Sequence, residues 1–105
     1  MTLSTPQAVL ERLEAIDADL AEKQNAWEQA AFDHFKAKRD REKAKASAFL
    51  TAKGSIAARN AIAEVETSSD GSEAEATYES LKAVIRVLET RATIGQSILR
   101  SQGRS

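Results

Sequence analysis

The chain has 105 residues, of which 30% are charged, and it carries a formal net charge of −1 with no cysteine. Its length allows one domain with a small core, and the lack of cysteine excludes disulfide bonds and cysteine-ligated zinc sites. No apolar run approaches the roughly 20 residues that a membrane span needs and the polar start has no signal-peptide core, so a soluble cytoplasmic protein without a membrane partner is expected.

The first predicted helix covers residues 6–53. The start signal is Ser4-Thr5-Pro6-Gln7, because a hydroxyl group can cap free N–H groups and proline fits the first turn of a helix. Gln7 is also placed to complete a capping box with Ser4. No further glycine or proline occurs before Gly54, so one continuous helix is predicted up to that point.

An apolar seam follows this helix in steps of three and four residues. It begins with Val9, Leu13, Ile16, Leu20 and Trp27, and it continues as Ala30, Ala37, Ala44 and Ala48. Small residues on a seam let two helices approach closely, so tight packing is predicted in the second half. His34 is the only histidine and falls on the same seam, where a polar packing role is expected rather than a ligand or a catalytic base.

Two breaks separate the later helices. Lys53-Gly54-Ser55 predicts a turn, because glycine can adopt a left-handed conformation and serine can cap the helix that follows. That short helix is predicted over residues 56–66, and the polar run 67–71 ends it. Ser72-Glu-Ala-Glu75 then reads as a capping box that opens a last helix over residues 72–100.

The last predicted helix carries two apolar seams. One is an a/d register of Tyr78, Leu81, Ile85, Leu88, Ala92, Gly95 and Leu99, and the other consists of Val84, Val87, Arg91, Ile94 and Ile98. Together they cover roughly 200° of the helix, about twice what packing on one neighbour requires. Other helices must cover it, and copies of the same chain are expected among them. The candidate interface residues are Val84, Val87, Ile94, Ile98 and Leu99.

These elements predict an all-α fold, with a single all-helical domain over residues 1–105. The first helix turns at Gly54, and the short helix and the long C-terminal helix return along it as a long helical hairpin. The combined length of the two return helices nearly equals that of the first, which makes this geometry consistent. The heptad spacing indicates a coiled-coil helical homo-oligomer.

Charges are segregated along the chain. Residues 36–45 carry six bases against two acids, between acidic segments at 11–33 and 64–79. Basic blocks can hold phosphates, and alternating blocks can also direct helix pairing. The bases form two thin ridges on nearly opposite sides of the helix: Lys38, Arg41 and Lys45 on one, and Lys36, Arg39 and Lys43 on the other. No exposed aromatic residue is expected among these basic residues, so binding by stacking of nucleobases is not favoured.

The sequence contains no recognisable catalytic constellation. Asp17 and Asp19 do not share a helix face, and Gly54 and Gly71 form no phosphate-binding loop. Trp27 and Tyr78 are expected in the core or at an interface. We therefore predict a protein that is not an enzyme, with no catalytic residue, cofactor or metal site.

The chain contains Ala48-Phe-Leu-Thr-Ala-Lys-Gly-Ser55 followed by Arg59, and later Ile85-Arg-Val-Leu-Glu-Thr-Arg91 and Ile94-Gly-Gln-Ser97. In these stretches it resembles a group of small helical bacteriophage proteins. These proteins are remotely similar to the UvsY recombination mediator, and the likeness covers residues 27–100. It implies a homo-oligomer that binds single-stranded DNA and helps to load a RecA-like recombinase onto strands coated by single-strand-binding protein, in the host cytoplasm. The matching bases are candidate DNA contacts: Lys53, Arg59, Arg86, Arg91 and Arg100.

Two functions remain open at this point. The first is a phage-type recombination accessory or mediator protein that binds single-stranded DNA through these bases and the block at residues 36–45. The second is a structural or adaptor protein, such as a virion component or a protein–protein interaction module, that uses the same helices only for assembly and binds no nucleic acid.

Overall fold

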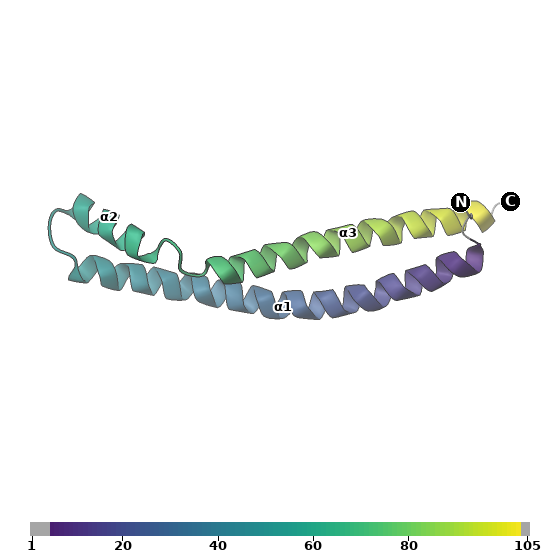
Figure 1. The fold of residues 1–105 in the computed structure, drawn as a ribbon, viewed down its shortest axis with the longest axis horizontal. Helices are drawn as coiled ribbons and strands as arrows, with labels where there is room; N and C mark the ends of the chain where they lie inside the picture. Colours follow the sequence, from purple (N-terminus) through teal and green to yellow (C-terminus); the bar gives the residue numbers. More distant parts are fainter. Residues whose placement is uncertain (1–4, 104–105) are drawn as a thin grey trace. The chain divides into compact units, whose positions relative to one another are not determined.

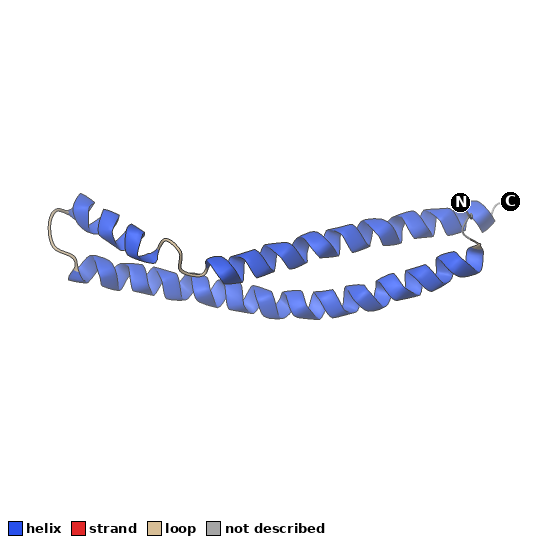
Figure 2. Cartoon of the chain, in the orientation of Figure 1, coloured by secondary structure: helices blue, strands red, loops and turns tan. Residues whose placement is uncertain are grey.

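The computed structural model describes residues 5–103 of the chain. Within this range all regular elements are helices (Figure 2). They are α1 (Pro6–Thr51), α2 (Ile56–Thr67) and α3 (Ser72–Gly103). The predicted all-α class is therefore confirmed for the described residues, and the helices differ from the predicted ranges only in their last turns.

The chain divides into two compact units. Unit 1 comprises Met1–Glu28 and Glu79–Ser105 as far as these are described, and unit 2 comprises Gln29–Tyr78. The helices α1, α2 and α3 follow one another along the chain (Figure 1). By residue number, α1 passes from unit 1 into unit 2, and α3 passes from unit 2 into unit 1. Both long helices therefore contribute to two separate packing environments.

The cap of α1 is supplied by Thr5. Its Oγ1 accepts a hydrogen bond of 3.1 Å from the N–H of Ala8, which is the geometry of an N-cap. Gln7 donates through Nε2 to Glu11, 3.3 Å away along the helix. Ser4, the predicted partner of Gln7 in a capping box, lies outside the described residues.

In unit 1, the first part of α1 packs antiparallel to α3, and the predicted seam of α1 faces the predicted a/d seam of α3. Their members in this unit are all buried or half-buried: Val9, Leu13, Ile16, Leu20 and Trp27 on α1, and Leu81, Ile85, Leu88, Ala92, Gly95 and Leu99 on α3. The closest approach uses Gly95, where an added Cβ would lie 2.7 Å from Cδ2 of Leu13. The missing side chain of Gly95 thus makes room for a leucine of the facing helix.

In unit 2, the second part of α1 packs against α2 and the first turns of α3. His34 stacks on Tyr78 with 4.9 Å between ring centroids and 17° between planes. The ring of Phe35 meets Tyr78 edge-on at 6.0 Å. His34 therefore packs within an aromatic cluster on the seam.

The alanine seam of α1 is interrupted at Ala44. Ala30 is buried and Ala48 is half-buried, but Ala44 is exposed, and Arg41 and Lys45 are half-buried instead. A strict seven-residue spacing drifts around a helix of 3.6 residues per turn. In this region α1 has α2 as its neighbour, and the contact follows the face of Arg41 and Lys45, so the prediction for Ala44 was wrong.

Both breaks between helices depend on glycines with positive φ. Gly54 has φ 114°, and Ser55 caps α2 by accepting a hydrogen bond from the N–H of Ala58 at 3.2 Å, as predicted. Gly71 has φ 78° and precedes Ser72, the first residue of α3. Ser72 is thus already helical and does not occupy the cap position that the predicted capping box requires.

The contact at Gly95 leads to a first prediction. Gly95→Val should destabilise the protein by about 1–3 kcal/mol, because a branched side chain overpacks the site against Leu13. Gly103→Val is the matched control, since an added Cβ at Gly103 meets nothing within 4 Å, and its melting temperature should equal that of the wild type. Thermal denaturation followed by circular dichroism measures both. An unchanged melting temperature for Gly95→Val would contradict the close packing in unit 1.

Candidate functional site

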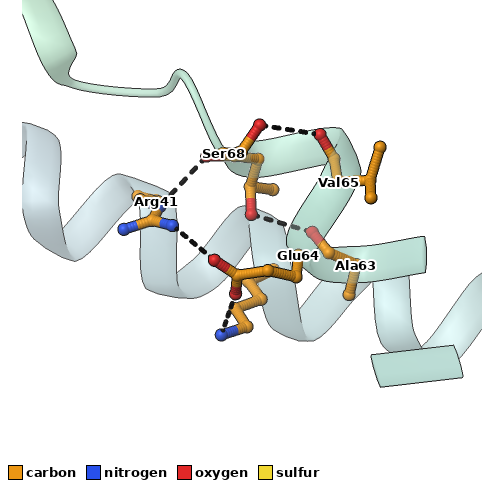
Figure 3. A network of polar contacts seen from close by, with 7 residues as sticks. Arg41, Ala63, Glu64, Val65 and Ser68 are labelled. Atoms are coloured by element: carbon orange, nitrogen blue, oxygen red, sulfur yellow. Dashed lines mark hydrogen bonds and ion pairs between the residues drawn. The ribbon is translucent and has the colours of Figure 1, made fainter. Parts of the chain in front are cut away.

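Two bases of the predicted ridge Lys38, Arg41 and Lys45 are engaged by α2 in unit 2 (Figure 3). Arg41 Nη2 lies 3.0 Å from Glu64 Oε1, and Lys45 Nζ lies 2.6 Å from Glu64 Oε2. Arg41 Nε also donates to the carbonyl oxygen of Thr67 at 3.0 Å. One carboxylate therefore joins two bases of α1, four residues apart, to the helix beside it.

The same network closes the C-terminal end of α2. The Oγ1 of Thr67, a residue that is only 3% exposed, donates to the carbonyl of Ala63 at 2.8 Å, and Ser68 Oγ donates to the carbonyl of Val65 at 3.1 Å (Figure 3). Carbonyl groups at a helix end lack partners within the helix, and a cation beside them is favourable. Arg41 therefore has a structural role as the cation at the end of α2.

The bases beside Glu64 stabilise its ionised form. Lys45, through its hydrogen bond and its positive charge, lowers the pKa of Glu64 below the ordinary value of 4.5, and Arg41 acts in the same direction. The Glu64 side chain is 51% exposed, so solvent screens these interactions and their contribution to stability is small.

Arg59, one of the bases that the phage resemblance points to, is also engaged within unit 2. Its Nε donates to the carbonyl oxygen of Phe49 at 3.0 Å. Its guanidinium carbon lies 4.3 Å from the centroid of the Phe49 ring, a cation–π arrangement. Arg59 therefore fastens the start of α2 to the end of α1.

The second predicted ridge lies on the opposite side of α1. Lys36, Arg39 and Lys43 are exposed, and Arg39 and Lys43 lie about 160° around the helix from Arg41 at 100° per residue. Lys38 is also exposed. These four bases face solvent, in contrast to the bases engaged by Glu64 and Phe49.

Aromatic side chains are exposed among these bases, and the expectation that none would be was wrong. Phe32 is 60% exposed and Phe35 is 53% exposed. In unit 2, α1 has neighbours on its inner side only, so bulky residues beyond the seam remain in contact with solvent. We call Phe32, Phe35, Lys36, Arg39 and Lys43 together the outer face.

The predicted group of Arg86, Arg91 and Arg100 does not share one face of α3. All three are exposed, but at 100° per residue Arg91 lies roughly 140° or more from the other two. Arg100 donates to Ser97 Oγ at 3.2 Å. Lys53 is exposed in the turn before α2, so the bases suggested by the resemblance occupy several separate places.

The second predicted seam of α3 is exposed in unit 1. Val84, Val87, Ile94 and Ile98 are 40%, 50%, 54% and 39% exposed, and we call them the aliphatic row. Leu99 is half-buried, since it belongs to the inner seam. A groove of about 400 Å³ adjoins the row, and its lining residues are Val9, Arg12, Leu13, Ile16, Arg91, Ile94, Gly95 and Ile98.

The charges of α3 avoid the aliphatic row. Five of the charged residues of α3 in unit 1 fall within a strip roughly 80° wide at 100° per residue, namely Glu79, Lys82, Arg86, Glu89 and Arg100. The side of the helix that carries the row has Arg91 as its one charge in this part of the chain. A solvated helix face normally carries mixed charges, so this side is suited to contact with another protein surface.

Within residues 5–103, no three His, Cys, Asp or Glu side chains are grouped so that they could hold a metal ion. In the same range, no helix combines the length and apolar character needed to cross a bilayer. No protein-family model matches the chain, and comparison with curated proteins and with solved structures gave no significant match.

The network at Glu64 predicts how stability depends on pH. Because the folded-state pKa of Glu64 is lowered, its ion pairs contribute above the ordinary pKa and are lost as the pH falls through the lowered value. Glu64→Gln should therefore melt slightly below the wild type at about pH 7 and lose less stability on acidification to about pH 3. Glu66→Gln, an exposed change on the same helix, is the control for general charge effects. Identical acid-induced losses in wild type and Glu64→Gln would contradict the network.

Proposed function

We propose that this chain is a non-enzymatic helical protein that assembles with copies of itself and, as an assembly, binds single-stranded DNA as a phage-type recombination accessory or mediator. The observation that carries this proposal is the exposed, nearly uncharged aliphatic row of α3. The exposed bases of α1 support the DNA-binding part, and the resemblance suggests a RecA-like recombinase and single-strand-binding protein as partners.

The protomer in this proposal is a long helical hairpin. Antiparallel contacts occur within each unit: Leu13 with Gly95 in unit 1, and Arg41 with Glu64 in unit 2. Turns at Gly54 and Gly71 are compatible with a return of the chain along α1. These contacts support the hairpin as the building block of a homo-oligomer.

The exposed surface supports self-association. In unit 1, the four side chains of the aliphatic row remain 39–54% exposed. Burying them against a second copy would remove this apolar area from water. The aliphatic row follows heptad spacing, and two such rows can pack against each other as in a coiled coil.

Assembly also explains how a nearly neutral chain could hold DNA. One copy presents few free bases on any one face, and the affinity for single strands rises steeply with the number of phosphates contacted. Several copies side by side would multiply these contacts. DNA binding is therefore proposed as a property of the assembly and not of one subunit.

A structural or adaptor protein is the second candidate. The observation that favours it is the intramolecular use of Arg41, Lys45 and Arg59. A chain whose bases served mainly to join its own helices would need no nucleic acid. The two candidates differ in whether a labelled oligo-dT binds at low salt.

The aliphatic row is tested by Ile98→Asp. A charge on the row should dissociate the assembly while the helical signal remains, because a buried carboxylate without a partner is strongly unfavourable. Val65→Asp is the control, since Val65 is 75% exposed on α2 in the other unit, and its mass should equal that of the wild type. Light scattering at micromolar concentration measures the masses. A monomeric wild type, or an Ile98→Asp variant of wild-type mass, would refute self-assembly through this row.

The free bases are tested with a triple variant, Lys36→Gln, Arg39→Gln and Lys43→Gln. Each phosphate contact on a single strand contributes about 0.7 to the slope of log affinity against log salt, so the slope should fall by about 2 per bound subunit. The mass and the melting temperature should stay as in the wild type. Arg41→Gln with Lys45→Gln is the comparison, and it should lower the melting temperature slightly because these bases contact α2. Fluorescence anisotropy with labelled oligo-dT gives the slopes, and an unchanged slope in the triple variant excludes this ridge as the DNA contact.

A further inference from the structure

The outer face of α1 combines rings and positive charges on one side of a helix. At 100° per residue, Phe32, Arg39 and Lys43 fall within about 40° of one another, with Phe35 on one flank and Lys36 on the other. All five side chains are exposed. This face belongs entirely to unit 2 and lies opposite the side that contacts α2.

Along α1 the two rings come first, and the three bases follow them toward the C-terminal end of the helix. With a rise of 1.5 Å per residue, Lys36, Arg39 and Lys43 follow at intervals of about 4.5 and 6 Å, and Phe32 precedes Lys36 by about 6 Å. A hollow on this side of α1 is lined by Phe35 together with Lys38, Arg39, Glu42 and Lys43. The flank therefore offers an aromatic surface with cations directly beside it.

The two phenylalanines are held differently. The ring centroid of Phe35 lies 5.1 Å from that of His34 and 6.0 Å from that of Tyr78. These contacts orient Phe35, which still exposes 53% of its surface. Phe32 is more open, at 60% exposure. An exposed ring on a helix gains little for the fold itself, since it leaves most of its apolar area in water.

We propose that the outer face is a stacking platform for single-stranded nucleic acid, with bases on Phe32 and Phe35 and phosphates on Lys36, Arg39 and Lys43. This inference rests on the proposed function and specifies how that function recognises its ligand. Single strands present flat rings and phosphates together, whereas a duplex keeps its rings stacked inside. Aromatic side chains within a basic groove are the usual platform for such strands.

The charges favour this occupant over a helix of another protein. A partner helix packed on Phe32 and Phe35 would also have to cover Arg39 and Lys43, and charges removed from water without good partners are costly. A phosphate backbone supplies a negative charge for every base. Among the exposed acids, Glu42 and Asp40 lie on the two flanks of the outer face, and Glu28 lies one turn before Phe32. Asp33 lies farther round the helix and accepts a hydrogen bond from Gln29 at 3.0 Å.

The test removes one ring and leaves the charges in place. Phe32→Ala should weaken binding to oligo-dT about fivefold or more, the fold-change that corresponds to the loss of one stacked base. Leu50→Ala is the matched control, because Leu50 lies on the same side of α1 and is 74% exposed but has no ring, so its affinity should equal that of the wild type. Phe32→Trp should restore binding to at least the wild-type level.

A second ligand separates stacking from charge. An abasic strand of the same length carries the same phosphates without rings, so wild type and Phe32→Ala should bind it equally. The salt slope measured with oligo-dT should also be the same for both proteins. Light scattering should give Phe32→Ala the wild-type mass.

The possible failures are distinguishable. A wild type that binds oligo-dT with a normal salt slope, while Phe32→Ala binds equally tightly, overturns the stacking platform and leaves the proposed function intact. A fivefold loss on the abasic strand, or a changed mass of Phe32→Ala, also overturns it, because the ring would then act through charge placement or through a protein interface. A wild type that binds no single strand at low salt refutes the DNA-binding function and this inference with it.

Discussion

The packing of one narrow seam against another is the interaction on which the rest of this structure depends. In unit 1, α1 and α3 meet as a pair, and a pair of helices has no enclosed interior. Side chains such as Leu13 and Ile85 are covered because they point at the partner helix, and Gly95 shortens the distance between the helices at one point. Apolar residues outside the seam remain in contact with water, and the exposed surface of the chain reflects this. The helix pair alone leaves these residues uncovered.

The division of the basic block follows from the same constraint. One side of α1 in unit 2 faces α2, and there Glu64 binds Arg41 and Lys45. The other side has no neighbour within the unit, so Arg39 and Lys43 keep their charges in solvent. A block that reads as uniform in the sequence thus has a structural half and a free half. The free half is the part that a phosphate backbone can reach without breaking contacts of the fold.

The seams and turns were predictable because they depend on local rules. The spacing of Leu13, Ile85 and Leu88 fixes which side of each helix is apolar, and Gly54 with Ser55 has the chemistry of a helix end followed by a cap. The exposure of Ala44 and Phe32 was not predictable in the same way. It depends on which helix lies beside α1 at that level, and the sequence periodicity of α1 does not contain this information. The role of Arg41 likewise depends on where α2 ends, at Thr67.

In the proposed function, self-association and DNA binding would reinforce each other. The aliphatic row and the outer face belong to different units of the protomer, so a change in one does not remove residues of the other. The salt-dependent part of the affinity grows with the number of phosphates neutralised, and a chain of net charge −1 with three bases on its outer face gains little from one copy alone. In the proposed platform, stacking on Phe32 would add a contribution that salt does not screen, since it depends on ring contact and not on charge. An assembly of such copies would therefore hold a single strand by many weak contacts, each able to release without the loss of the whole, which suits a protein that passes a strand to another.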